Sequence, residues 1–156
     1  MNYIVAGPPG SGKTTYVMNR RSPGDLIVDT DAIYQAITGL PLYDKPDNLL
    51  DVVMSVKQTL LAHIRPTNSW FNSWVIITGA HQQERSRLAA QLSAQVIVLE
   101  IGYSDCVRRI QQDKSRPEFV RKYYPAIIEK WWNTYQRYPS DTIITLKDQV
   151  AKAPKP

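Results

Sequence analysis

The sequence predicts a three-layer α/β domain built on one parallel sheet, and two observations indicate this class. Short apolar segments alternate with segments of helical periodicity along the whole chain. The apolar segments show no alternation with polar residues, as expected of parallel strands that are buried on both faces. The five expected strands are residues 3–6, 26–28, 74–78, 95–99 and 142–146.

The expected helices follow from the spacing of apolar residues and from the turn residues between them. In one helix, Leu50, Val53 and Val56 recur every three residues. Pro125 is expected near the start of the last helix or at a bend in it, because proline lacks the amide hydrogen. The helices are expected at residues 13–20, 32–37, 47–64, 82–92, 104–112 and within 118–138.

Length and composition indicate one ordinary globular domain. The chain has 156 residues, of which 43% are hydrophobic and 21% charged. We expect a single domain over residues 1–150 and a flexible C-terminal tail over residues 151–156. The sequence shows no apolar run of membrane-spanning length and no secretory leader, so we expect a cytoplasmic protein without a membrane partner. Cys106 is the single cysteine, which excludes an internal disulfide and agrees with a reducing setting.

A glycine-rich loop follows the first expected strand. The segment Gly7-Pro8-Pro9-Gly10-Ser11-Gly12-Lys13-Thr14 meets the pattern G-x-x-x-x-G-K-[ST] at every fixed position, and a helix is expected directly after it. In such a loop the backbone N–H groups cradle phosphates, and the helix N-terminus adds partial positive charge. Lys13 is expected to reach the β- and γ-phosphates, and the Thr14 hydroxyl to ligate Mg²⁺. The loop, with Thr15, therefore predicts a site for a nucleoside triphosphate, with ATP and Mg²⁺ as cofactors.

Two carboxylates follow the second expected strand. Asp29 and Asp31 lie at the carboxyl end of that strand, which is the edge where ligands bind in open α/β sheets. Asp29 is expected to hold the hydration shell of Mg²⁺. Asp31 is expected to accept a proton from an attacking hydroxyl. The alternative is that Asp31 caps the helix that begins at Ala32.

These segments resemble the small P-loop kinases. The phosphate loop followed by Ile27-Val28-Asp29-Thr30-Asp31 is similar to a group that includes shikimate and gluconate kinases, nucleotide kinases and polynucleotide 5′-hydroxyl kinases. The resemblance in layout covers nearly the whole chain. It implies a three-layer P-loop NTPase domain with a five-stranded parallel sheet in the order 2-3-1-4-5, a mobile lid before the last long helix, and transfer of the γ-phosphoryl group to a hydroxyl. The stretch Lys130-Trp131-Trp132 also looks like small bacteriophage ATP-binding proteins.

Within this group the resemblance to polynucleotide kinases extends further along the chain. Residues 75–78 and then 83–87 are similar to the strand and helix after that family's acceptor site, and residues 107–109 with Arg116 imitate its lid. This resemblance implies Asp31 as general base and a nucleic-acid 5′-hydroxyl or a nucleotide as acceptor. The chain departs from the pattern at residues 34–35, Tyr-Gln, near the position where that family has an arginine for the acceptor phosphate. The net charge of +5 agrees with a polyanionic partner.

Two alternatives remain open from the sequence. The first is a small-metabolite kinase, although the resemblance to shikimate kinases ends after Asp31, since the only arginine between residues 32 and 84 is Arg65. The second is an NTP-hydrolysing or nucleotide-binding module without kinase activity. Motor ATPases usually carry an acid at the end of the strand beside the loop strand, whereas residues 77–79 are Ile-Thr-Gly. This difference favours a kinase.

The polar connector of residues 113–117 is expected to be the lid. It carries two cations and joins two helices on the side where the phosphates must lie. A transferring phosphoryl group spreads negative charge over its equatorial oxygens, and a closing segment can neutralise that charge. We therefore expect Arg116 to reach this group, and Arg109 to lie nearer the adenine or the β-phosphate. The alternative is that both arginines are solvated lid charges.

Overall fold

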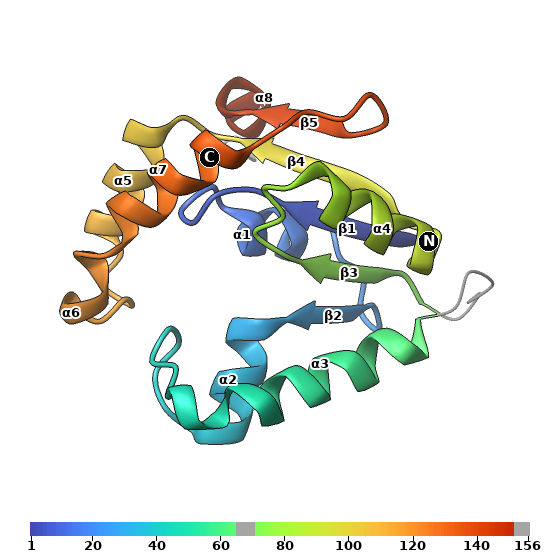
Figure 1. Ribbon diagram of the computed structural model, residues 1–156, viewed down its shortest axis with the longest axis horizontal. Coiled ribbons are helices and arrows are strands. Elements are labelled where there is room, and N and C mark those ends of the chain that lie inside the picture. The colour runs from blue at the N-terminus through green and yellow to red at the C-terminus, as the bar shows by residue number, and fades with distance from the viewer. Residues whose placement is uncertain (65–70, 152–156) are drawn as a thin grey trace.

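The computed structural model describes residues 1–64 and 71–151, which form a parallel five-stranded sheet with helices on both faces (Figure 1). The order of the strands is β2-β3-β1-β4-β5, and every neighbouring pair is parallel. This confirms the predicted fold class and strand order. The strands are β1 (Asn2–Ala6), β2 (Leu26–Asp29), β3 (Ser73–Ile76), β4 (Gln95–Glu100) and β5 (Thr142–Thr145).

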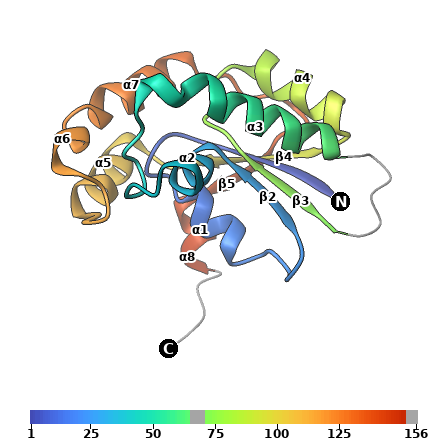
Figure 2. The same ribbon diagram turned by 90° about the horizontal axis from the view of Figure 1, so that it is seen from below.

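The helices form the two outer layers. Figure 2 shows α3, α4 and α7 over one face of the sheet and α1 and α8 against the other. Among the described residues, no helix has the length and apolarity needed to cross a membrane. The helices are α1 (Lys13–Met18), α2 (Thr30–Thr38), α3 (Leu50–His63) after the 3₁₀ turn η1 (Asp47–Leu49), α4 (Gln82–Leu92), α5 (Tyr103–Gln112), α6 (Glu118–Arg121), α7 (Tyr124–Thr134) and α8 (Leu146–Ala151).

The strands are apolar on both faces because successive side chains enter two different cores. In β1, Ile4 packs in the cluster that contains Leu92 and Trp131, whereas Val5 packs in the cluster that contains Val17. All these side chains are at most 4% exposed. The same alternation in β3 and β4 explains why the sequence shows continuous apolar runs at these strands.

Two elements at the C-terminal end differ from the expectation. The last long helix is divided into α6 and α7, and Pro125 lies in the first turn of α7, where its missing amide hydrogen is tolerated. Helix α8 follows β5 directly, because the Asp148 carboxylate accepts hydrogen bonds from the Thr145 amide and hydroxyl, both at 2.7 Å. This helix includes Ala151, the expected first residue of the tail; residues 152–156 lie outside the described chain.

A buried arginine fixes the loop after β3. The Arg85 side chain is 1% exposed and donates from Nη1 to the carbonyls of Gly79 (2.7 Å) and Ala80 (2.9 Å). Its Nη2 forms an ion pair with the Asp141 carboxylate at 2.7 Å, and Asp141 is also 1% exposed. Arg85 belongs to the segment that resembles polynucleotide kinases, yet the structure places its side chain in the interior. Its role here is to tie the carboxyl end of β3 to the segment before β5.

We expect Arg85→Met to lower the free energy of unfolding by about 3–5 kcal/mol, because Asp141 would remain as a buried unpaired charge. Chemical denaturation of the two proteins measures this difference. The control is Arg87→Met on the same helix, where the side chain is exposed and the expected change is within about 0.5 kcal/mol. Equal stability of the two variants would contradict the role assigned to Arg85.

Candidate active site

The phosphate loop has a backbone that requires glycine. Gly10 and Gly12 have φ angles of 80° and 88°, in the left-handed region. A Cβ atom at Gly10 would lie 2.7 Å from the Cys106 carbonyl oxygen, so the packing of α5 also excludes a side chain there. Gly12 is the N-cap of α1, and no side chain caps this end. The first N–H groups of α1 therefore face the loop without a side-chain partner.

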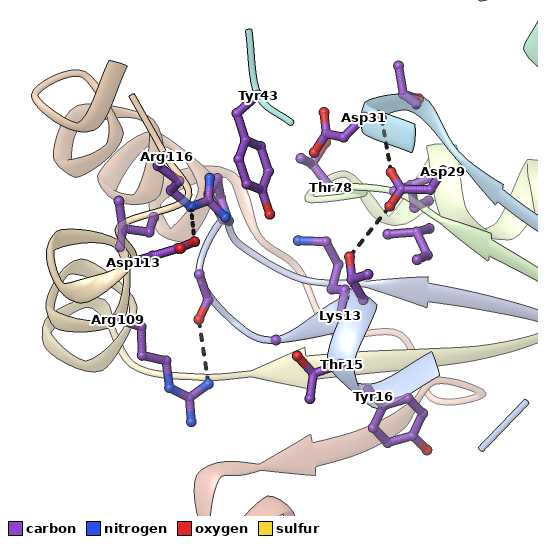
Figure 3. Close-up of a pocket in the computed structure, with 18 of the residues that line it drawn as sticks. Lys13, Thr15, Tyr16, Asp29, Asp31, Tyr43, Thr78, Arg109, Asp113 and Arg116 are labelled. Carbon is purple, nitrogen blue, oxygen red and sulfur yellow. Dashed lines mark hydrogen bonds and ion pairs between the residues drawn. The ribbon is translucent and has the colours of Figure 1, made fainter. Parts of the chain in front are cut away.

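Lys13 is enclosed by its own loop. Its Nζ donates to the carbonyl oxygens of Gly7 (2.8 Å) and Pro8 (2.9 Å). Burial lowers the pKa of Lys13 to about 8, against the opposing effect of the nearby Asp31 and Asp29 charges. Figure 3 shows the ammonium group pointing into the space between Tyr43 and the two carboxylates. The ammonium is therefore placed at the mouth of the loop, where the outer phosphates of a nucleotide would lie.

Asp29 connects the phosphate loop to α2. One carboxylate oxygen lies 3.4 Å from the Thr14 hydroxyl, and the other accepts a hydrogen bond from the Asp31 amide at 3.0 Å (Figure 3). The second contact caps α2, so the helix cap is Asp29 and not Asp31, the alternative that the sequence had left open. Burial, followed by the charge of Asp31, raises the pKa of Asp29.

The donor set of Thr14 and Asp29 suits Mg²⁺. A hydroxyl and one carboxylate leave most of an octahedron to phosphate oxygens and water, which is the usual way that proteins hold this ion with a nucleotide. Within residues 1–64 and 71–151, no group of three or more His, Cys, Asp or Glu side chains could hold a metal ion. A cation at Thr14 and Asp29 would need further oxygen ligands from phosphate or water.

The Asp31 carboxylate does not cap α2, and it faces the open side of the site. Its Oδ1 accepts from Lys45 Nζ at 2.8 Å, and its side chain is 30% exposed. Burial lowers the pKa of Lys45, but the charge and hydrogen bond of Asp31 outweigh that effect and raise it. The Asp31 carboxylate is therefore held by a lysine from the segment after α2.

These side chains line one cavity of about 1080 Å³ at the carboxyl ends of the strands. On one side of the loop the cavity is bordered by Thr15, Tyr16 and residues of α5 and α8. On the other side of Lys13 the cavity is bordered by residues of α2, α3 and the lid connector (residues 113–117), and Figure 3 shows Asp31, Tyr43 and Arg116 on this side. The side chains that line this second part include Asp31, Tyr43, Lys45, Lys57, Glu84 and Arg116.

Arg109 packs against the outside of the phosphate loop. Its Nη1 donates to the Ser11 carbonyl at 3.2 Å, and its Nη2 donates to Gln149 Oε1 at 3.2 Å. Gln149 in turn donates to the Ser11 carbonyl at 3.0 Å. Arg109 and Gln149 both line the cavity beside Thr15 and Tyr16. This position agrees with the expected place of Arg109 near the nucleotide, which stays a prediction.

Arg116 reaches the cavity from the lid connector. Its Nε donates to the Asp113 carboxylate at 3.0 Å, and its side chain is only 10% exposed. The guanidinium carbon lies 3.7 Å from the centre of the Tyr43 ring and 4.8 Å from that of Tyr124. The Arg116 side chain therefore forms a largely buried part of the cavity wall, which differs from the solvated lid charge of the alternative.

The structure thus brings the sequence-predicted residues to one site in different ways. Lys13, Thr14, Asp29, Asp31, Arg109 and Arg116 line the cavity, as do Pro9, Gly10, Gly12 and Thr15. The other loop residues support the loop from behind: the Gly7 amide donates to the Thr78 carbonyl, the Pro8 carbonyl accepts from the Ser11 amide, and Ser11 is fully buried. Arg65 lies outside the described residues.

Several lining residues carried no recognisable signal in the sequence. Tyr43, Lys45, Lys57 and Glu84 come from a loop and two helices that approach the phosphate loop only in the fold. Gln149 belongs to α8, a helix that was not expected from the sequence after the fifth strand. For Gln149, the Thr145–Asp148 capping pair was the available signal, since it predicts the start of a helix.

The fold, compared with known proteins, is that of the small P-loop kinases. No protein-family model matches the sequence, and no curated protein is significantly similar to it. A gluconokinase from Sinorhizobium meliloti is similar in structure with a TM-score of 0.57 and 14% sequence identity, over 97% of this chain and 85% of that one. Identities this low show a shared fold alone.

Two shikimate kinases have the same fold. The enzyme from Bacteroides thetaiotaomicron has a TM-score of 0.57 and 12% identity, over 93% of this chain and 86% of that one. The enzyme from Acinetobacter baumannii, in complex with shikimate, has a TM-score of 0.52 and 19% identity, over 97% of this chain and 88% of that one. The sheet order and the phosphate loop therefore define the fold of P-loop NTPase domains, which this chain shares with these small kinases.

Proposed function

We propose that this protein is an ATP-dependent phosphotransferase that moves the γ-phosphoryl group to a hydroxyl of a small molecule. The observation that carries the proposal is the second part of the cavity, beyond the phosphate loop. A hydrolase needs room there only for a water molecule, whereas this part is lined by a carboxylate, two lysines, a glutamate and a tyrosine. Such a set of polar groups is suited to binding an organic acceptor.

The proposed reaction uses Asp31 as the general base. The acceptor hydroxyl oxygen attacks the γ-phosphorus, a new O–P bond forms, and the bond from the γ-phosphorus to the β,γ-bridging oxygen breaks. The hydroxyl proton passes to the Asp31 carboxylate, and ADP leaves with the bonding electrons. Asp31 suits this role because its carboxylate faces the cavity and only Asp29 is occupied with capping α2.

Two cations of the chain neutralise the transferring group in this proposal. Lys13 lies at the mouth of the loop and Arg116 at the facing wall, so the two approach the γ-phosphate from different sides (Figure 3). Mg²⁺, held by Thr14 and Asp29 together with the phosphates, would supply further positive charge at the leaving oxygens. Charge placed in advance in this way stabilises the transition state without rearrangement.

A small molecule is a better acceptor than a nucleic-acid end. The structural neighbours include a gluconokinase and shikimate kinases, whose names state small-molecule acceptors. The segment 83–87, which resembles polynucleotide kinases, supplies no arginine for an acceptor phosphate at the cavity, because Arg85 is buried in an ion pair with Asp141. Shikimate itself stays disfavoured, since Arg116 is the arginine on the acceptor side among the described residues, and the proposed reaction uses it for the transferring phosphoryl group.

Simple ATP hydrolysis is the second candidate function. The strand that adjoins β1 toward β2 is β3, and the residues after it, Ile77-Thr78-Gly79, contain no acid that could orient a water molecule. Asp29 and Asp31 belong to the end of β2, one strand farther from the loop strand. This arrangement favours transfer to a bound acceptor.

Incubation with γ-labelled ATP and a panel of acceptors tests the proposal. The panel contains sugars, hydroxy acids, nucleosides, nucleotides and 5′-hydroxyl oligonucleotides, and Lys13→Ala serves as the control for a contaminating kinase. Label in a small molecule is the expected result. Label in the oligonucleotide alone would restore the nucleic-acid acceptor, and release of free phosphate with every acceptor would contradict the kinase.

We expect Arg116→Ala to lower kcat about 10²-fold and to leave the ATP dissociation constant within about threefold, because the contact forms mainly in the transition state. Single-turnover transfer and equilibrium ATP binding in the same variant measure the two effects. Lys114→Ala, an exposed cation of the same connector, is the control. Equal losses in transfer and binding would make Arg116 a ground-state phosphate ligand instead.

A further inference from the structure

The segment between α2 and η1, residues 39–46, contacts two groups that the proposed reaction uses, the Asp31 carboxylate and the Arg116 guanidinium. We call this segment the acceptor loop. Lys45 of the loop holds the Asp31 carboxylate at 2.8 Å, and Tyr43 of the same loop places its ring over the Arg116 guanidinium at 3.7 Å. Asp31 comes from α2 and Arg116 from the lid connector, so two residues of one loop join two distant elements of the site.

The backbone at Tyr43 is held in an uncommon conformation. Its φ angle is 75°, in the left-handed region, which bulky residues adopt only when the surroundings compensate for the strain. The ring in this conformation points into the cavity, where it stacks on Arg116 (Figure 3). The stacking contact is a compensation that the structure shows directly, since a guanidinium over an aromatic face is attractive.

The Arg116 guanidinium is restrained by three contacts. Tyr43 and Tyr124 are both within stacking distance of it, and Asp113 binds its Nε. The two Nη groups form the part of the guanidinium that these contacts leave to the cavity. Tyr124 and Asp113 belong to the lid side itself, whereas Tyr43 comes from the opposite side of the cavity. Tyr43 is therefore the contact through which the acceptor side can influence the position of Arg116.

We propose that Tyr43 is a positioning residue, which holds Arg116 in the orientation needed for phosphoryl transfer and couples this orientation to the acceptor loop. The inference rests on the proposed function for its catalytic consequence, but the stack itself is independent of that function. Contact of a bound acceptor with the acceptor loop would act on Arg116 through this stack, so the acceptor side can stabilise the orientation that the cation already has.

Two substitutions separate the ring of Tyr43 from its backbone. Tyr43→Gly removes the ring and suits a φ of 75°, so the loop can keep its path without strain. Tyr43→Phe keeps the stacking face and removes only the hydroxyl. Tyr123→Leu is the matched control, because Tyr123 is an exposed tyrosine adjacent to Tyr124 and does not line the cavity.

Transfer kinetics form the first readout. We expect Tyr43→Gly to lower kcat for transfer roughly tenfold, the effect of losing one partly buried cation–π contact. The ATP dissociation constant should change less than about threefold, and Tyr43→Phe should retain most of the transfer rate. The proposal would be overturned by Tyr43→Gly with the kcat of the unmodified protein, or by equal losses of transfer and ATP binding.

The second readout requires no activity. In the NMR spectrum of the unliganded protein, the two rings should shift the Arg116 Nε–H resonance, which an Arg116→Lys variant assigns. Tyr43→Gly should move this resonance toward the position of solvated arginines, and Tyr43→Phe should not. An unmoved resonance in Tyr43→Gly would overturn the proposal. If no acceptor is labelled by any variant, the proposed function fails, and the resonance alone decides whether Tyr43 holds Arg116.

Discussion

Lys13→Ala is expected to abolish phosphoryl transfer, with a loss of about 10²-fold or more in kcat, and to weaken the binding of ATP. The Lys13 ammonium lies at the mouth of the phosphate loop, within 2.9 Å of two loop carbonyls. Its charge would contact the β- and γ-phosphates in the ground state, and the contact would strengthen as charge develops on the transferring group. Both affinity and turnover therefore depend on it.

The measurement is label transfer from ATP together with the equilibrium dissociation constant of ATP. Lys130→Ala is the matched control, since Lys130 is an exposed lysine of α7 that does not line the cavity. The loop should keep its shape in Lys13→Ala, because Gly10 and Gly12 and not the lysine determine its backbone. If Lys13→Ala turned over substrate about as fast as the control, catalysis at the phosphate loop would be refuted.

The parts of the site that are local in sequence could be predicted without the structure. The phosphate loop is one continuous segment whose glycines, lysine and threonine all act within eight residues, and β1 and α1 flank it as expected. The parallel strands were also predictable, because burial on both faces leaves an unbroken apolar run. Strand order followed from the resemblance to the small P-loop kinases and not from the residues themselves.

The acceptor side could not be predicted, because its residues meet only through the fold. Lys57 lies between the exposed and the buried face of α3. Glu84 lies in the first turn of α4, where the sequence alone indicates an ordinary solvated helix residue. Tyr43 has a left-handed backbone conformation, in which glycine or asparagine is the usual residue. Residues that depart from a local rule in this way are often those that serve a site.

Which of Asp29 and Asp31 caps α2 could also be decided only from the structure. Asp29 is the last residue of β2 and Asp31 lies two residues further on, and helix-capping statistics accept either of them as an N-cap. In the structure Asp29 is the cap, because its carboxylate accepts a hydrogen bond from the Asp31 amide at 3.0 Å. The Asp31 carboxylate faces the cavity and accepts a hydrogen bond from Lys45. One hydrogen bond thus distinguishes the two carboxylates, and the proposed function assigns the metal shell to Asp29 and the general base to Asp31.

Asp31→Asn is expected to lower kcat for transfer about 10²- to 10⁴-fold, the usual contribution of a general base, while the ATP dissociation constant stays within about threefold. Asparagine has the same shape but cannot accept the hydroxyl proton. Single-turnover label transfer measures the loss, and Asp51→Asn on the exposed face of α3 is the control. Asp29→Asn should differ in kind, since it should raise the Mg²⁺ concentration needed for activity.

A second variant distinguishes the base from a purely structural role for Asp31. The Asp31 carboxylate also binds Lys45 at 2.8 Å, so its loss could act by releasing the acceptor loop. Lys45→Met breaks the same ion pair and leaves the carboxylate in place. If Asp31 is the base, Lys45→Met should retain at least about ten times more transfer activity than Asp31→Asn, because only the second change removes the proton acceptor. Equal losses in the two variants would show that Asp31 serves to hold the loop, and the proton would then have to leave the acceptor by another route.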